Sequence, residues 1–174
     1  MIKLIISDFK TNGAGGVLTY FVIYFTNASF RLILNYRIGY FLMNSNYSVL
    51  RLLSNFYRYR QMTKRCCHIS YHSDLGRGIK FPHPLGIVIG EGVVIKDNVQ
   101  IWQHVTLGSS GKKGEGLTYP TIQDGVKIYT GAVLLGKINV GANAVVGANS
   151  VVNTDVPENS VVAGIPAKII STAN

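Results

Sequence analysis

Apolar residues recur every six positions along the second half of the chain. Between Ile122 and Pro157 the repeat is unbroken, and a small or medium-sized residue follows each repeat position by four. The repeat positions are all branched aliphatics: Ile122, Ile128, Leu134, Val140, Val146 and Val152. A period of six matches neither an amphipathic helix nor the simple alternation of a strand. It predicts a solenoid in which three six-residue units close one triangular coil.

The same phase extends upstream, with one irregular step and one interruption. It passes through Ile69, Leu75, Phe81, Ile89, Ile95, Ile101 and Leu107. The step from Phe81 to Ile89 is eight residues long, so two extra residues bulge the coil there. The segment 108–121 is rich in glycine and polar residues, and we expect it to be extruded from one corner. Glycines near the corners, such as Gly125 and Gly131, suit turns that favour a residue without a Cβ.

The first part of the chain has helical patterning in place of the six-residue repeat. We predict an irregular lead over residues 1–16, one helix over 28–43 and a second over 48–64. The repeat ends near Pro157. The predicted division of the chain is a helical region, a solenoid domain and a C-terminal arm: 1–66, 67–160 and 161–174.

The net charge of +9 is concentrated in the helical region. Residues 1–65 hold nine Lys or Arg against one acid, Asp8, so they carry +8 of that charge. Aromatic residues are interleaved with these cations between Tyr20 and Tyr59. The combination favours helices that cap the open end of the solenoid, and it also suits contact with an anionic membrane surface. Nucleic-acid binding would explain the charge as well, but no recognised motif accompanies it.

Composition and cysteine content narrow the class of protein and the cellular compartment that we expect. Apolar residues make up 47% of the chain and charged residues 14%, which excludes a disordered protein. Cys66 and Cys67 are adjacent, and we expect two reduced structural thiols, because vicinal disulfides are strained and no metal-ligand spacing is present. No signal peptide is visible, and no uninterrupted apolar run of about 20 residues exists. We therefore expect a cytoplasmic protein, with peripheral membrane contact through residues 1–65 as an open alternative.

Four motifs connect the segment 68–168 with a known family. They are Leu75-Gly-Arg-Gly-Ile, His83-Pro-Leu-Gly-Ile-Val-Ile-Gly-Glu91, Val105-Thr-Leu-Gly108 and Ala163-Gly-Ile-Pro-Ala-Lys168. With the repeat, they make the segment resemble the serine acetyltransferase branch of the hexapeptide-repeat acyltransferases. The resemblance implies a mainly β fold, the left-handed parallel β-helix. It also implies a homotrimer that takes acetyl-CoA as co-substrate in the groove between neighbouring solenoids and requires no metal.

Acetyl transfer to a hydroxyl needs a base, a donor for the oxyanion and a trough for the thioester arm. The resemblance assigns the base to His83, which lies in the eight-residue step. The family has an aspartate fifteen residues before this histidine, whereas this chain has His68 there. A neutral imidazole can accept a hydrogen bond but cannot stabilise imidazolium as a carboxylate does. His104 is a candidate for the same groove if the coils stack in register.

The resemblance also implies where acetyl-CoA is held. Gly108, Ser109, Thr130 and Ala148 are small enough to leave room for the pantetheine arm, and Lys168 is expected near the nucleotide. The backbone N–H groups of Gly108 and Ser109 are the candidates for the oxyanion. Two loop cations are either phosphate partners or solvated charges: Lys112 and Lys113.

The acceptor is predicted from departures from true serine acetyltransferases. The family's Asp before the catalytic histidine is Pro82 here, and its Arg-His pair before the loop's proline is Thr118 and Tyr119. A zwitterionic amino acid needs charged partners, whereas a neutral sugar needs hydrogen bonds and an aromatic surface. Tyr119, His104 and Trp102 are the candidates for such a surface. We therefore expect an O-acetyltransferase acting on a saccharide of a surface polysaccharide or its precursor, closest in layout to short members of the colanic-acid type.

Two alternatives to a polysaccharide enzyme stay open. One is a serine O-acetyltransferase, and the other is a non-catalytic scaffold built on the solenoid. A β-helical carbonic anhydrase is disfavoured, because no suitably spaced histidine pair is present for its metal. Docking to cysteine synthase is not expected, because residues 171–174 lack the family's isoleucine-terminated tail.

Overall fold

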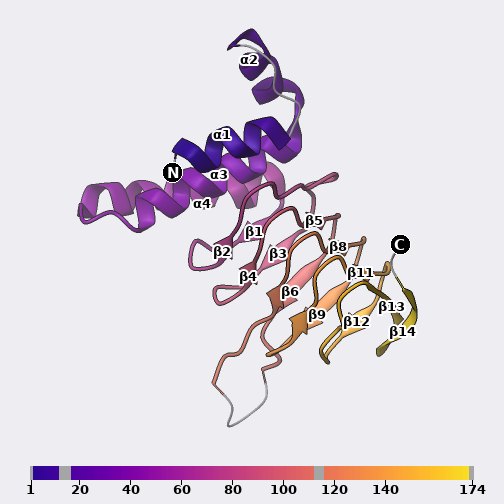
Figure 1. Ribbon diagram of the computed structural model, residues 1–174. Coiled ribbons are helices and arrows are strands. Elements are labelled where there is room, and N and C mark those ends of the chain that lie inside the picture. Colours follow the sequence, from indigo (N-terminus) through magenta and orange to yellow (C-terminus); the bar gives the residue numbers. More distant parts are fainter. Residues whose placement is uncertain (1, 12–16, 112–115, 173–174) are drawn as a thin grey trace.

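A helical region leads into a triangular solenoid (Figure 1). The structure is a computed structural model and describes residues 2–11, 17–111 and 116–172. The helices, in chain order, are α1 (Ile2–Thr11), α2 (Val17–Thr26), α3 (Ala28–Met43) and α4 (Ser48–Arg65). They lie at the end of the solenoid where its first coil begins, and the C-terminal strands lie at the opposite end.

The solenoid has three faces, each a sheet of stacked strands. Sheet A contains β1 (His68–Ile69), β3 (Val88–Ile89), β6 (Thr106–Gly108), β9 (Val133–Leu135) and β12 (Val151–Val152). Sheet B contains β2 (Asp74–Leu75), β4 (Val94–Ile95), β7 (Thr121–Ile122) and β10 (Asn139–Val140). Sheet C contains β5 (Gln100–Ile101), β8 (Lys127–Ile128), β11 (Val145–Val146), β13 (Ser160–Gly164) and the antiparallel β14 (Ala167–Thr172). The chain visits A, B and C in turn, which confirms the predicted left-handed parallel β-helix.

The six-residue repeat corresponds to one strand and one corner. Each short strand points one side chain inward, and the repeat positions Ile122, Ile128, Leu134 and Val140 are fully buried. The smaller residues four positions later, from Val126 to Val156, are buried as well. Apolar side chains from all three sheets thus fill the prism, and burial of this surface is the main stabilising term.

Left-handed backbone conformations make the corners tight. Gly125 and Gly131 have φ near +70°. A Cβ at either glycine would overlap the amide oxygen of the asparagine one coil later, Asn143 or Asn149. Both asparagines are themselves left-handed, with φ of 56°. The corner glycines are therefore required by close approach between coils as well as by backbone conformation.

The helical region has more helix than the sequence analysis predicted. The helices expected over 28–43 and 48–64 are confirmed as α3 and α4. The irregular lead is wrong for residues 2–11, which form α1, and α2 was not predicted; residues 12–16 lie outside the described part. A helix of ten residues is marginal in isolation, so α1 depends on packing, for example the stacking of Phe9 on Phe30 with ring centroids 4.0 Å apart.

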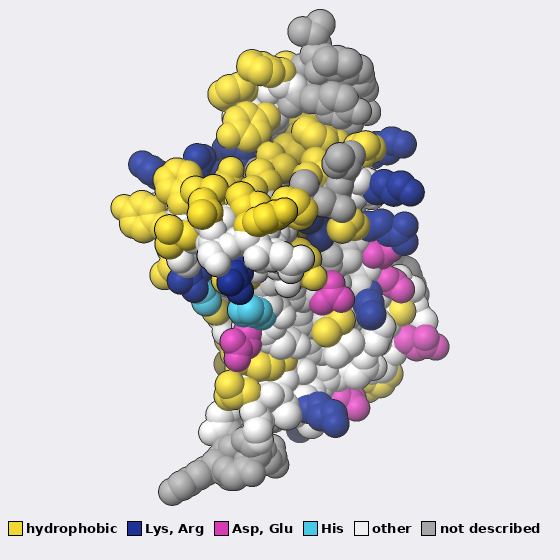
Figure 2. Space-filling model, turned by 90° about the vertical axis from the view of Figure 1, so that its left-hand side faces the viewer, with side chains coloured by type: hydrophobic (Ala, Val, Ile, Leu, Met, Phe, Trp, Pro, Cys, Tyr) yellow, Lys and Arg dark blue, Asp and Glu magenta, His cyan; other side chains and the backbone are white. Residues whose placement is uncertain are grey.

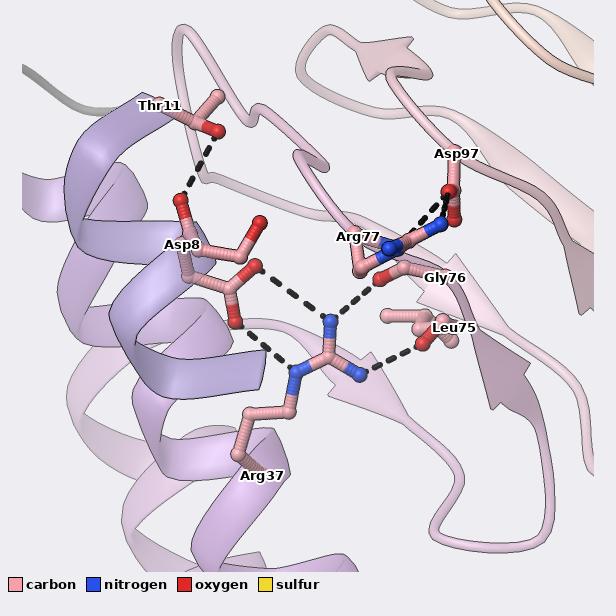
Figure 3. Close-up of polar contacts among 8 residues, drawn as sticks. Asp8, Thr11, Arg37, Leu75, Gly76, Arg77 and Asp97 are labelled. Carbon is pink, nitrogen blue, oxygen red and sulfur yellow. Dashed lines mark hydrogen bonds and ion pairs between the residues drawn. The ribbon is translucent and has the colours of Figure 1, made fainter. Parts of the chain in front are cut away.

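A buried arginine fastens α1 and α3 to the first coil (Figure 3). The Arg37 Nε donates to Asp8 Oδ2 at 2.9 Å, and both side chains are almost fully buried. Its remaining nitrogens donate to the carbonyl oxygens of Leu75, at 2.6 Å, and Gly76. Burial raises the pKa of Asp8, and the Arg37 guanidinium opposes that rise. One side chain thereby satisfies polar groups from a helix and from the end of β2.

Helix α4 runs directly into the first strand. Cys66 follows its last turn in a left-handed conformation with φ of 48°, and its N–H caps the Gln61 and Met62 carbonyls. The buried Gln61 Oε1 accepts the N–H of Ile69 at 2.5 Å. The Cys66 carbonyl accepts the N–H of Gly86 one coil later. Cys66 and Cys67 are both free thiols, and burial raises the pKa of Cys67.

Removal of the Arg37 guanidinium is expected to destabilise the protein strongly. Arg37→Leu leaves the Asp8 carboxylate buried without its cation and two carbonyls without a donor. The expected loss in the free energy of unfolding is about 3–5 kcal/mol, measured by urea denaturation. Because Asp8→Asn removes the orphaned charge, the double variant should recover part of that loss; equal stability of the single variant and the wild type would contradict this account.

Helix α3 approaches the solenoid closely at Gly39. A Cβ at that position would overlap the ring of Tyr71, which is buried in the first coil. Gly39→Ala should therefore push α3 away from the coil and lower the free energy of unfolding by about 1–3 kcal/mol, despite the better helix propensity of alanine. Gly116→Ala, where nothing lies within 4 Å of the added atom, is the control. An unchanged melting temperature for Gly39→Ala would show that Tyr71 swings aside at no cost.

Candidate active site

The residues singled out in the sequence lie mainly along the two edges of sheet A. At the corner where sheet C passes into sheet A, each of four successive coils contributes candidates: His83, His104, Thr130 and Ala148. At the opposite corner, toward sheet B, the extruded segment begins with Gly108 and Ser109 and ends with Tyr119. His68 lies on sheet A itself, in β1. The stacking of coils thus places residues up to 65 positions apart (83 to 148) along one edge.

His83 lies on a bulge of the C–A corner. Lys80 forms a bridge with Gln100, and Val88 pairs with Thr106, so seven residues, 81–87, span what five residues, 101–105, span in the next coil. The two extra residues expected from the sequence are therefore present. His83 is exposed, lies between Pro82 and Pro84, and its carbonyl accepts the N–H of Leu85 at 2.8 Å. A short turn flanked by two prolines restricts the backbone that carries this imidazole.

His104 lies at the same corner, one coil further on. Its N–H donates to the Leu85 carbonyl at 2.8 Å, and its backbone is left-handed with φ of 58°. Its Nδ1 occupies the space that a Cβ on Gly86 would need, three residues after His83. The sequence-based placement of His104 near the His83 corner is thus consistent with the stacking of the two coils.

Gln103 is a site candidate that was not singled out from the sequence. Its Oε1 is buried and accepts no hydrogen bond from the described residues. Its carbonyl oxygen accepts the N–H of Gly131 at 3.0 Å, which holds the corner of this coil against the next. A buried acceptor without a donor costs free energy, so this oxygen is available to a ligand N–H or O–H. No sequence signal distinguished Gln103 from an ordinary corner residue.

His68 is exposed on the outer surface of sheet A. It pairs with Val88 in the neighbouring strand, and its N–H donates to the Ile87 carbonyl at 2.8 Å. The strand after the His83 bulge is therefore its immediate neighbour. Both imidazoles belong to the described part of the chain, and no hydrogen bond joins them there. The structure places His68 beside the site without showing it as the orienting partner of His83.

Tyr119 closes the far edge of sheet A. Its ring lies over Gly90 and Gly92, and a Cβ on either glycine would overlap it. Burial raises the pKa of Tyr119, and the charge of Glu91 and a hydrogen bond to that carboxylate raise it further. The Tyr119 hydroxyl therefore lies near the Glu91 carboxylate. The packing of the ring on Gly90 and Gly92 fixes the end of the extruded segment on the A–B corner. It also brings Glu91 into the candidate site, although in the sequence Glu91 was only the last residue of a motif.

The candidates for acetyl-CoA are small residues or residues at the surface. The Gly108 carbonyl accepts the N–H of Gly136, and that of Thr130 accepts the N–H of Asn149. Ala148 is exposed on the C–A corner. Lys168 is exposed on β14, paired with Ala163, whose methyl group lies near Gly147 of the same corner. The expected loop cations, Lys112 and Lys113, lie outside the described residues.

Trp102 and Tyr129 form an aromatic pair beside the C–A corner. Their rings stack with centroids 4.5 Å apart and planes 30° from parallel. Trp102 follows β5 and Tyr129 follows β8, so the pair joins successive coils of sheet C. Trp102 is half-buried by this contact. The pair accounts for Trp102 as a packing residue between coils, without requiring an acceptor on its face.

Known proteins similar to this chain are serine acetyltransferases. No protein-family model matches. The serine acetyltransferase of Haemophilus influenzae is 43% identical over 144 residues, which is 82% of this chain and 52% of that protein. The soybean serine acetyltransferase solved with serine superposes with a TM-score of 0.82 at 34% identity, over 97% of this chain and 68% of that one. The serine acetyltransferase of Brucella abortus solved with coenzyme A has a TM-score of 0.82 at 29% identity, over 99% and 68%.

These similarities overturn the polysaccharide assignment. Departures at three positions, Pro82, Thr118 and Tyr119, suggested a sugar acceptor, whereas the relatives matched over most of the chain are serine acetyltransferases. The predicted likeness to polysaccharide O-acetyltransferases is therefore wrong, and the alternative is better supported. The chain spans about half the length of the relatives it matches by sequence. Over that span, the shared sequence and fold show that this protein belongs to the serine acetyltransferase family.

Proposed function

We propose that this protein is a serine O-acetyltransferase that transfers the acetyl group of acetyl-CoA to the hydroxyl of L-serine. The observation that carries the proposal is the His83 bulge at the C–A corner, in a chain of this family. Two of the similar structures were solved with serine and with coenzyme A, the acceptor and the carrier that the reaction requires. The extra residues of the bulge present an exposed imidazole next to His104 and Gln103.

His83 serves as the general base. It removes the proton of the serine hydroxyl as the oxygen attacks the thioester carbonyl, and a C–O bond forms. When the tetrahedral intermediate collapses, the C–S bond breaks and the imidazolium returns the proton to the thiolate of coenzyme A. The step needs no other reactant, and the imidazole ends in its starting state. A neutral histidine suits this role at physiological pH.

The oxyanion is better served by Ser109 than by Gly108. Gly108 lies within β6, in register with Leu135 of β9, and its carbonyl is taken by the Gly136 N–H. The Thr106 N–H donates to the Ala132 carbonyl on the β9 side, and N–H groups two residues apart in a strand point the same way. The Gly108 N–H is therefore directed into the ladder. Ser109, the first residue after β6, is free of that constraint.

The charged ends of serine need partners that differ from those of the family. Glu91 lies near Tyr119 at the A–B edge, across sheet A from His83, so in the proposed trimer its carboxylate would meet the ammonium group from a neighbouring protomer. Lys80 shares a hollow of about 710 Å³ with Pro82, the residue before His83, and offers a cation for the carboxylate. The buried Gln103 Oε1 is a further acceptor at the same corner. These groups supply both signs of charge in place of the Asp and Arg that the chain lacks.

The working unit is proposed to be a homotrimer. A single corner of a solenoid forms only one wall of a trough, whereas acetyl-CoA has a long pantetheine arm. Small residues along the C–A corner, such as Thr130 and Ala148, leave room for that arm, and a neighbouring solenoid supplies the second wall. Lys168, exposed on β14 near the last turn of the corner, is placed for the nucleotide end.

Replacement of His83 tests the base. His83→Ala should lower kcat about 10²–10⁴-fold, with little change in the KM for acetyl-CoA, because the imidazole acts on the acceptor proton. Release of free thiol from acetyl-CoA in the presence of L-serine measures it. His72→Ala is the matched control, since His72 is an exposed histidine of the turn between β1 and β2. Full activity of His83→Ala would exclude His83 as the base.

A panel of acceptors tests the substrate. L-Serine should support thiol release that saturates with its concentration, and an L-serine derivative blocked at the hydroxyl should support none. Lys80→Ala should raise the KM for serine and leave that for acetyl-CoA unchanged, because it removes the cation proposed for the carboxylate. Turnover of other hydroxyl compounds without turnover of L-serine would contradict the acceptor and leave acetyl transfer intact.

A further inference from the structure

Helix α4 presents a stripe of large apolar residues to solvent, whereas its fully buried residues are polar. The buried residues of α4 are Ser54 and Gln61. Its large apolar residues are exposed: Val49 (71%), Leu52 (70%), Leu53 (47%), Phe56 (54%) and Tyr59 (63%). Spacings of three and four place these five side chains on one stripe, hereafter the α4 outer face. An uncovered apolar face of this extent on a soluble helix indicates a binding surface.

A cluster of cations lies at one end of the α4 outer face. Arg31, Arg60, Lys64 and Arg65 line a pocket of about 530 Å³, together with Phe56 and Tyr59. Burial and then the charges of Arg31 and Arg60 lower the pKa of Arg65. The Arg65 Nε is buried without a hydrogen-bond partner among the described residues. Like charges are therefore held together around a hollow that contains an unpaired donor, which suits a phosphate group.

No carboxylate of the helical region balances this cluster. The only acid among residues 1–65 is Asp8, and the structure pairs it with Arg37. Figure 2 shows hydrophobic side chains gathered over the helical region with Lys and Arg beside them, whereas the acidic side chains in that view lie on the solenoid. The helical region therefore supplies no counter-charge for the cluster, which leaves it open to an anionic partner.

The charge decides which partner fits the α4 outer face. Contact between two α4 outer faces would bring two sets of cations together without an acid, so this form of self-association is opposed by repulsion. Nucleic acid would satisfy the cations but leave the stripe of Val49, Leu52, Leu53 and Phe56 in water. A bilayer with anionic headgroups satisfies both requirements, because apolar side chains enter the acyl boundary while cations meet phosphates.

We propose that the α4 outer face docks on an anionic phospholipid bilayer, with the Arg31–Arg60–Arg65 pocket receiving a headgroup phosphate. Within the described segments, no helix is long and apolar enough to cross a membrane, so the contact is peripheral. Phe56 belongs to both parts of the surface, since it lines the pocket and stacks under Arg60, whose guanidinium carbon lies 5.8 Å from the ring centroid. The docking is independent of the acceptor used by the enzyme.

Vesicle flotation tests the docking with the full chain. The protein should float with vesicles that contain half phosphatidylglycerol and should remain behind with pure phosphatidylcholine, and high salt should weaken the binding. Phe56→Asp should reduce the partition coefficient about tenfold or more through lost insertion. Arg60→Glu should reduce it about tenfold, because two units of charge change near the headgroups.

Matched controls separate docking from folding and from general charge. Lys96→Glu and Ile170→Asp alter an exposed cation and an exposed apolar residue of the solenoid and should leave flotation unchanged. Arg60→Glu relieves repulsion within the cluster, so its melting temperature should not fall. Absence of flotation by the wild type, or full flotation by Phe56→Asp, would overturn the proposal. A lower molecular mass of Phe56→Asp in light scattering would overturn it too, by showing that the face joins copies of the chain.

Discussion

The hydrogen-bonded ladder between successive coils determines where every functional residue lies. In an undisturbed coil, each strand pairs with the strand 18 residues later, as Lys127 pairs with Val145. Corners therefore stack directly above corners, and residues distant in sequence form one continuous edge. The C–A edge exists for that reason, with His83, His104, Thr130 and Ala148 contributed by four coils. A register slip of one residue would turn the buried aliphatics outward and disperse the edge.

The solenoid could be predicted because its pattern is local and repeated. Every strand points an aliphatic side chain inward and is followed by a corner, so the six-residue period is visible in the sequence. The eight-residue step also revealed the His83 bulge. Helices α1 and α2 left no such pattern, because α1 is held by tertiary contacts such as Phe9 on Phe30 and Asp8 on Arg37. Helix α4 was predicted from the sequence, but its periodicity does not show that the apolar stripe faces solvent. Only the burial of Ser54 and Gln61 in the structure shows it.

Candidate site residues could be predicted where a local sequence motif marks them, and not where only tertiary contacts do. His83 stands in a distinctive motif, and Tyr119 precedes a proline at the end of the extruded segment, so both could be singled out. Gln103 is identified by an unsatisfied buried oxygen, and Glu91 by its nearness to the Tyr119 hydroxyl, neither of which the sequence shows. The predicted sugar acceptor was wrong because it rested only on the charged family residues that are replaced here by Pro82, Thr118 and Tyr119. Charges from other parts of the fold, such as Glu91 and Lys80, were not considered as replacements.

The left-handed Cys66 has a mechanical consequence. Only two residues, Cys66 and Cys67, separate the last turn of α4 from the first strand, and the carbonyl of Cys66 accepts a hydrogen bond from the N–H of Gly86 in the bulge. Helix α4 and the corner that carries His83 are therefore closely connected through the backbone. If α4 rests on a lipid surface, the His83 imidazole stands at a set height above the headgroups and faces a set direction, and any tilt of the helix is transmitted to that corner.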